Sequence, residues 1–142
     1  MGTNIIGVIP GRHWSTTLDR PLVVGAHWDS YEMTPGLNDN GSGILALLET
    51  ARLLSKKSLD CFRPDFSIIF VAFDGEERGC RGSQQFVSSL VAPLHRQGIK
   101  TQGAIILHTI LYYVMALNSQ IISLFLSILK QSFSILKFYK IG

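Results

Sequence analysis

The feature that most constrains the fold is an almost uninterrupted apolar run over residues 66–73, FSIIFVAF, in the middle of the chain. A short apolar run of this kind is typical of a strand that is buried on both faces, as in a parallel sheet. Shorter runs predict further strands at residues 4–9, 21–26 and 103–107. The chain therefore favours a sheet that is covered on both faces.

Two helical patterns separate these strands. Apolar residues recur at helical spacing over residues 44–54, and two lysines follow in the expected last turn. A second helix is predicted over residues 83–92, and Pro93 is expected to end it. Because strands and helices alternate along the chain, the predicted fold is an α/β domain with a largely parallel sheet.

Composition narrows the functional classes. The 142 residues suffice for one domain, and a charged fraction of 16% with a mean hydropathy of +0.26 excludes disorder as a description of the whole chain. The net charge of +3 comes from scattered Lys and Arg without a basic run, so no nucleic acid partner is expected. No signal peptide is recognisable, which leaves localisation open between an intracellular chain and one whose true N-terminus is missing.

The last part of the chain differs in composition. No Asp, Glu, Lys or Arg occurs over residues 103–129, and residues 121–142 are almost entirely Ile, Leu, Phe, Ser, Lys and Tyr. This stretch is long enough to span a bilayer, with Lys130, Lys137 and Lys140 as anchors. The span is not favoured, because residues 118–120 are polar and the upstream part is better explained as a strand. We expect a domain at residues 1–110 and an apolar low-complexity tail at residues 111–142.

Side chains that bind metals or move protons gather where the predicted strands end. They are His27 and Asp29, then Asp39 in the following loop, then Asp74, Glu76 and Glu77, and finally His108. Because the carboxyl ends of parallel strands meet at one edge of a sheet, we expect these side chains to converge. Each residue alone is explained as a polar loop or turn residue, and their shared position is what favours a functional site.

These residue types indicate metal chemistry. Imidazole together with carboxylate is a donor set for zinc or a similar divalent ion. The adjacent Glu76 and Glu77 suit a division of roles, in which one glutamate binds metal and the other stays off it as a general base.

Three segments carry a resemblance to a known family: VVGAHWDS at 23–30, PGLNDNGSG at 35–43 and FVAFDGEERG at 70–79. Together they resemble the co-catalytic zinc aminopeptidases of metallopeptidase family 28, and the resemblance covers residues 4–109. It implies a three-layer αβα sandwich with a mostly parallel sheet, two zinc ions as cofactors and a peptide substrate. The implied reaction is hydrolysis of a peptide bond, typically with release of an N-terminal residue.

The same resemblance implies roles for individual residues. His27 matches a ligand of one zinc ion, Asp39 the carboxylate that bridges both ions, and Glu77 a ligand of the other ion. Asp29 matches the acid that orients His27, and Glu76 matches the general base that takes a proton from water. The implied activity is that of a zinc-dependent exopeptidase.

Two positions depart from the family pattern. His108 stands where the family has Asp or Glu as a further ligand of the first zinc, and no later histidine completes the second zinc. His27, Asp39 and His108 supply three ligands for one ion, whereas Asp39 and Glu77 supply only two for the other. We therefore expect at most one tightly bound zinc per chain. We also expect the peptidase domain to be cut short after its fourth strand.

Other interpretations stay open beside an exopeptidase impaired by truncation. One is an inactive remnant that serves at most in binding. Another is a single-zinc acyltransferase similar to the glutaminyl cyclases, whose fold is related. Aminopeptidase and carboxypeptidase action are both compatible with these residues, and the frequent secretion of family members does not decide the localisation of this chain.

Overall fold

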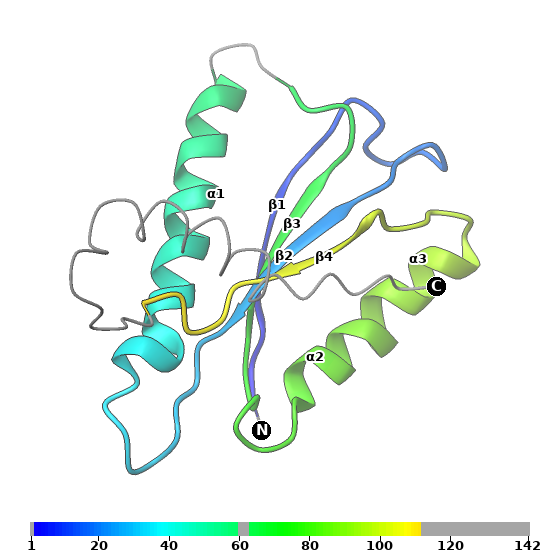
Figure 1. Cartoon of the computed structure of the whole chain (residues 1–142). Coiled ribbons are helices and arrows are strands. Elements are labelled where there is room, and N and C mark those ends of the chain that lie inside the picture. The colour runs from blue at the N-terminus through cyan, green and yellow to red at the C-terminus, as the bar shows by residue number, and fades with distance from the viewer. Residues whose placement is uncertain (1, 60–62, 112–142) are drawn as a thin grey trace, which may run out of the picture.

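A computed structural model describes residues 2–59 and 63–111 and arranges them as a four-stranded sheet with helices on both sides (Figure 1). The strands are β1 (Ile5–Ile9), β2 (Leu22–His27), β3 (Ile68–Phe73) and β4 (Gly103–Ile106), in the spatial order β1-β3-β2-β4. β2 pairs in parallel with both β3 and β4, whereas β1 is antiparallel to β3 at one edge. The predicted strands and the largely parallel sheet are confirmed.

Along the chain, helical segments alternate with strands β2, β3 and β4, as the sequence pattern predicted. The kinked π-helical turn η1 (Leu37–Ser42) and α1 (Gly43–Leu59) connect β2 to β3. Between β3 and β4, the segments α2 (Arg81–Phe86), η2 (Val87–Val91) and α3 (Ala92–Arg96) follow one another without a break. The prediction that Pro93 ends the second helix is wrong. The helical backbone continues through Pro93 to Arg96, and the π-helical stretch η2 lies directly before α3.

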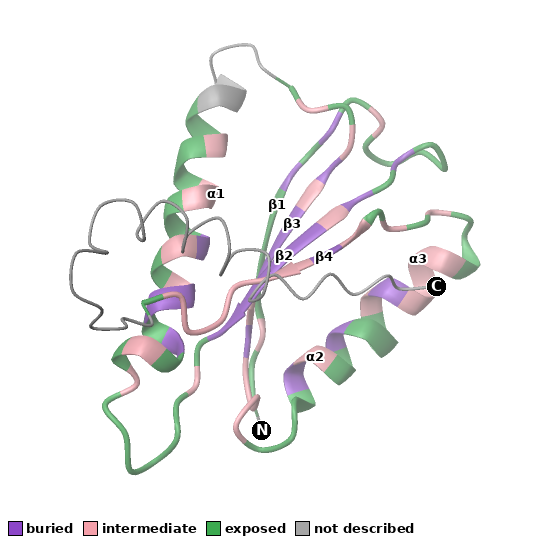
Figure 2. Cartoon of the chain, in the orientation of Figure 1, coloured by how far each residue is buried: buried purple, intermediate pink, exposed green. Residues whose placement is uncertain are grey.

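The sheet is covered on both faces (Figures 1 and 2). On one face, α1 covers a core of buried side chains that consists of Ile9, Val24, Ala26, Leu47 and Phe70. On the other face, the α2–α3 segment covers a core that includes Val23, Ile69, Val71, Phe86 and Val91. Neighbouring residues of β2 and β3 alternate between the two cores, because successive side chains of a strand point to opposite faces. The three-layer αβα sandwich is therefore confirmed.

The topology also determines where polar loops meet. β2, β3 and β4 run parallel, so the loops that follow them leave from the same edge of the sheet. β2 ends at His27, Glu76 and Glu77 follow β3, and His108 follows β4. The predicted convergence of these residues is thus a consequence of strand direction.

The predicted tail at residues 111–142 lies outside the described residues, apart from Leu111. The domain boundary at residue 110 and the membrane span that was not favoured there both stay predictions. Within residues 2–59 and 63–111, none of the helices has the length and apolar character that crossing a membrane requires.

Gly25 tests the packing at the centre of the sheet. A Cβ atom at Gly25 would collide with the buried Phe73 ring, whereas a Cβ atom at Gly7 on β1 would meet nothing within 4 Å. We expect Gly25→Ala to lower the free energy of unfolding by about 1–3 kcal/mol, because the ring must shift. The matched control, Gly7→Ala, should leave it unchanged or raise it by about 0.4–1 kcal/mol. Urea unfolding measures both, and equal effects would contradict this packing.

Candidate metal centre

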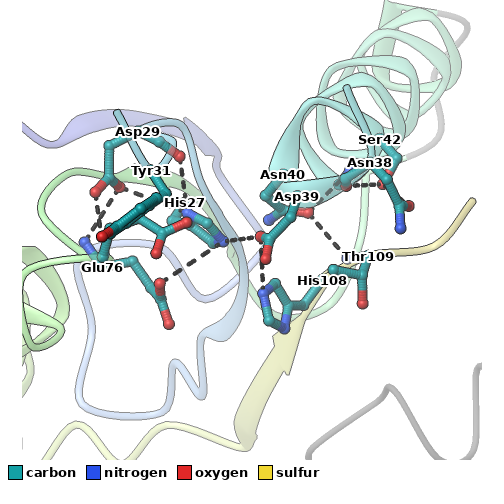
Figure 3. Close-up of polar contacts among 12 residues, drawn as sticks. His27, Asp29, Tyr31, Asn38, Asp39, Asn40, Ser42, Glu76, His108 and Thr109 are labelled. Carbon is teal, nitrogen blue, oxygen red and sulfur yellow. Dashed lines mark hydrogen bonds and ion pairs between the residues drawn. The ribbon is translucent and has the colours of Figure 1, made fainter. Parts of the chain in front are cut away.

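Three of the predicted metal ligands meet at the carboxyl edge of the sheet (Figure 3). His27 ends β2, Asp39 lies at the kink in η1, and His108 follows β4. The Nε2 atoms of His27 and His108 lie 3.0 and 3.1 Å from the same oxygen, Oδ1 of Asp39. One potential ligand atom from each of the three residues lies within 4.8 Å of the others. The structure therefore brings these residues together as one compact cluster.

The two ring nitrogens of His27 have different surroundings. The residue is only 3% exposed, and its Nδ1 lies 3.0 Å from the backbone carbonyl oxygen of Asp29. Because a carbonyl oxygen can only accept a hydrogen bond, this contact assigns the proton to Nδ1 in the neutral form of the ring, and Nε2 then presents a lone pair. This buried Nε2 has no hydrogen-bond partner in the part of the chain that the structure describes. Its 3.0 Å approach to Asp39 Oδ1 is a close contact without hydrogen-bond geometry.

A buried lone pair that faces a carboxylate oxygen is unfavourable, because both atoms are acceptors. A divalent cation would use both atoms as ligands and so satisfy the buried nitrogen. The hydrogen bond from Nδ1 to a backbone carbonyl is also the kind of contact that orients metal-binding histidines. Two imidazoles and one carboxylate are a donor set that suits zinc, with a coordination position left open. The residues present therefore fit the zinc ion that the sequence predicted.

Glu76 and Glu77 approach the same histidine from the end of β3, and Figure 3 shows Glu76 on the side of His27 away from Asp39. Glu76 Oε2 lies 4.0 Å from His27 Nε2, and its side chain is 36% exposed, so water can reach it. His27, Glu76 and Glu77 form a second group with ligand atoms within 4.8 Å of one another. His27 is shared by both groups, and neither group joins Asp39 with Glu77.

Asp29 holds the turn that carries the two glutamates. Its Oδ1 accepts a hydrogen bond from the N–H of Glu76, and its Oδ2 accepts one from the N–H of Glu77, both at 3.1 Å. Asp29 Oδ1 also lies 3.5 Å from His27 Nδ1, but the shorter contact to that nitrogen comes from the Asp29 carbonyl oxygen. The residue therefore orients His27 mainly through its backbone, and its carboxylate positions the glutamates.

Asp74 also follows β3, but it serves another purpose. Its Oδ2 accepts a hydrogen bond from the N–H of Thr3 at 2.7 Å, and its own N–H donates to Asn4 Oδ1 at 3.0 Å. Asp74 thus attaches the segment before β1 to the end of β3. It is not among the potential ligands of either metal-binding group.

Sequence reasoning missed the role of Asn40, because within the motif at residues 35–43 it assigned a role to Asp39 alone. Asn40 is buried, and its Oδ1 accepts a hydrogen bond from the N–H of Gly43 at 3.2 Å, as a helix cap does. Its contacts with the segment after β4 connect distant parts of the chain and leave no local signal.

An open cavity of about 570 Å³ lies beside the turn that carries Glu76 and Glu77, called the glutamate turn below. Asp29, Tyr31, Glu77 and Arg78 are among its lining residues, whereas the three clustered ligands are not. A molecule bound in this cavity would therefore meet the site from the side of the glutamates.

Comparison with known proteins shows which family the chain resembles. The sequence model of peptidase family M28 matches residues 4–115, a range that includes every predicted site residue. Aminopeptidase YwaD of Bacillus subtilis is 48% identical over 69 residues, which are 49% of this chain and 14% of that protein. The resemblance inferred from the three motifs is confirmed.

Two solved structures share the fold. An aminopeptidase from Aneurinibacillus sp. strain AM-1 has a TM-score of 0.62 and 30% identity, over 75% of this chain and 24% of its own. BSAP, a zinc aminopeptidase from Bacillus subtilis, has a TM-score of 0.53 and 39% identity, over 61% of this chain and 20% of its own. The chain thus spans less than a quarter of the length of each of these relatives.

Asp29→Ala tests how the glutamate turn is held. The substitution removes the acceptors of two N–H groups, so we expect faster hydrogen exchange at Glu76 and Glu77 and a loss of about 1–3 kcal/mol in stability. Glu32→Ala is the matched control from the same loop, because its ion pair with Arg78 is largely exposed and contributes little. Exchange at the two glutamate amides that stays as slow as in the parent chain would contradict the assigned hydrogen bonds.

Proposed function

Because the chain belongs to peptidase family M28, we propose that it acts as a zinc-dependent exopeptidase in which His27, Asp39 and His108 hold one zinc ion. The observation that carries this proposal is the buried Nε2 lone pair of His27, which faces Asp39 and lacks a hydrogen-bond partner among the described residues. The proposed substrate is a peptide, in keeping with the aminopeptidases to which the chain is similar. The chain spans only part of the length of these relatives. Exopeptidase activity of this chain is therefore part of what we propose.

The proposed chemistry divides between the ion and the side chains around it. Zinc held by the cluster supplies a Lewis acid that polarises the carbonyl of a peptide bond. Glu76 acts as the general base, and its carboxylate takes a proton from the attacking water and returns it to the leaving amine. The exposure of Glu76 and its position 4.0 Å from His27 Nε2 support this role. Asp29 keeps the base in place through the N–H groups of the glutamate turn.

The donor count supports one ion rather than two in this chain. The first group offers two imidazoles and the Asp39 carboxylate, and a zinc site normally keeps at least three protein ligands. For a second ion, Asp39 and Glu77 would supply only two carboxylates. They would supply no imidazole, because His27 already binds the first ion in this proposal. We propose that any second zinc is bound much more weakly.

A single tightly held zinc also supports a second candidate, an acyltransferase similar to the glutaminyl cyclases. Glu76 would serve either reaction as an acid–base group. Cyclisation of an N-terminal glutaminyl peptide would favour the acyltransferase, and release of chromophore from an aminoacyl chromogenic substrate would favour the exopeptidase. Retention of zinc without either activity would favour a binding remnant.

The zinc content of the purified chain tests the site. After dialysis against a weak chelator, we expect elemental analysis to give at most one zinc per chain, and none for His27→Ala, because that site then has only two protein ligands. His13→Ala is the matched control, since His13 lies beside Phe66 at the opposite end of β3. Two retained equivalents, or retention that His27→Ala leaves unaffected, would contradict the ligand assignment.

Glu76→Gln tests the proposed general base. The substitution removes the proton acceptor but keeps the size of the side chain, so we expect hydrolysis to fall by about 10²–10⁴-fold while zinc stays bound. The rate on an aminoacyl chromogenic substrate and the zinc content are measured on the same sample. If Glu76→Gln loses as much zinc as Glu77→Gln, the two glutamates have been assigned the wrong way round.

A further inference from the structure

We propose that Asn40 is a positioning residue, whose buried amide sets His108 against Asp39 and so assembles the zinc ligands from two distant loops. The inference rests on the proposed zinc site. It concerns a residue that touches neither the ion nor the substrate in that proposal.

The amide of Asn40 binds the backbone on both sides of His108. Its Nδ2 donates to the carbonyl oxygen of Leu107 at 2.9 Å. Its Oδ1 accepts from the N–H of Thr109 at 3.1 Å, and both of these residues are labelled in Figure 3. The same Oδ1 accepts from the N–H of Gly43 at the start of α1. Because Asn40 directly follows Asp39, one side chain fixes the backbone of two ligands relative to each other and to the helix.

The site is built closely around this amide. Asn40 is 2% exposed, so its polar atoms have no access to water and depend on these backbone partners. A Cβ atom at Gly43 would collide with both the Asn40 amide and the carbonyl oxygen of Leu107. Only glycine at position 43 therefore lets the three segments approach this closely.

The backbone beside His108 needs such support. Thr109 has a φ of 47°, a left-handed conformation that is unfavourable for a β-branched residue unless its surroundings hold it there. The last backbone hydrogen bond to the sheet in this segment is from Leu107 to Gly25, so His108 lies beyond the strand pairing. The Asn40 hydrogen bond to Thr109 holds the chain at the point where the sheet no longer does.

Two further side chains of the same loop extend the contact. Ser42 Oγ accepts a hydrogen bond from the N–H of Ile110 at 3.1 Å, and Asn38 Oδ1 accepts one from the N–H of Leu111 at 3.0 Å. Residues 38, 40 and 42 thus hold the segment after β4 at successive points. Asn40 is the member that flanks His108 directly.

The test compares Asn40→Ala with Ser67→Ala in the full 142-residue chain. Ser67 is an equally buried polar residue, but its hydrogen bonds to Gly11 and Asp19 lie at the opposite end of β3. We expect Asn40→Ala to weaken Zn²⁺ binding by about 10–100-fold, measured by competition with a chromogenic chelator, and Ser67→Ala to leave it unchanged. If Asn40→Ala does not fold, Ser42→Ala should produce a smaller loss in the same direction.

A double-mutant cycle separates positioning from general destabilisation. In a His108→Ala background, Asn40→Ala should cause a much smaller further loss of Zn²⁺ affinity, because one of the two residues that it holds together is already absent. An equal loss in both backgrounds, or no loss in the parent background, would overturn the inference.

A metal-free measurement keeps this inference distinct from the proposed function. The ring centroids of His27 and His108 are 5.1 Å apart, so we expect a nuclear Overhauser effect between the rings in metal-free protein. It should disappear in Asn40→Ala and persist in Ser67→Ala. If the parent chain binds no Zn²⁺ but this pattern holds, the proposed function fails and the role of Asn40 stands. If the contact persists in Asn40→Ala, the role of Asn40 fails whatever the Zn²⁺ result.

Discussion

The site depends on one histidine at the end of the central parallel strand. His27 is buried, its Nδ1 proton is used by the carbonyl oxygen of Asp29, and its Nε2 lone pair faces the carboxylate of Asp39. In a neutral ring this arrangement places two acceptors against each other at a nitrogen that is itself buried, which is unfavourable unless a cation joins them. The fold therefore creates a place where positive charge stabilises the protein.

The rest of the architecture serves to surround that nitrogen. β2 is flanked by β3 and β4 in parallel, so the glutamate turn and His108 leave the sheet beside His27. Asp29 holds the glutamate turn from one side, and Asn40 holds the His108 segment from the other. His27 ends a strand, whereas the other proposed ligands come from loops that hydrogen bonds attach beside the end of the sheet, and such support allows loop residues to form a precise site.

Much of this follows from local sequence patterns. The continuous apolar runs of β2 and β3 and the helical period of α1 determine the elements, and strand direction then brings His27, Glu76 and His108 to one edge. The antiparallel direction of β1 could not be predicted from the sequence, because a short apolar run is compatible with either strand direction. The continuation of the helix past Pro93 depended on the preceding π-helical stretch.

The contacts of Asn40 could not be predicted for a different reason. They join a loop before α1 to a segment after β4, and hydrogen bonds between such distant residues leave no periodicity or spacing in a single sequence. Sequence patterns thus predicted the candidate ligand residues, while the tertiary structure shows how their side chains are oriented.

X-ray absorption at the zinc edge tests the central claim most directly, because it counts imidazole ligands around the bound ion. For the zinc-loaded chain we predict two histidine ligands, with Zn–N distances of about 2.0–2.1 Å, and oxygen ligands for the rest. In His108→Ala, loaded with zinc and measured without dialysis against a chelator, one histidine contribution should remain. A spectrum with no histidine scattering, or one that is the same with and without His108, would contradict the account.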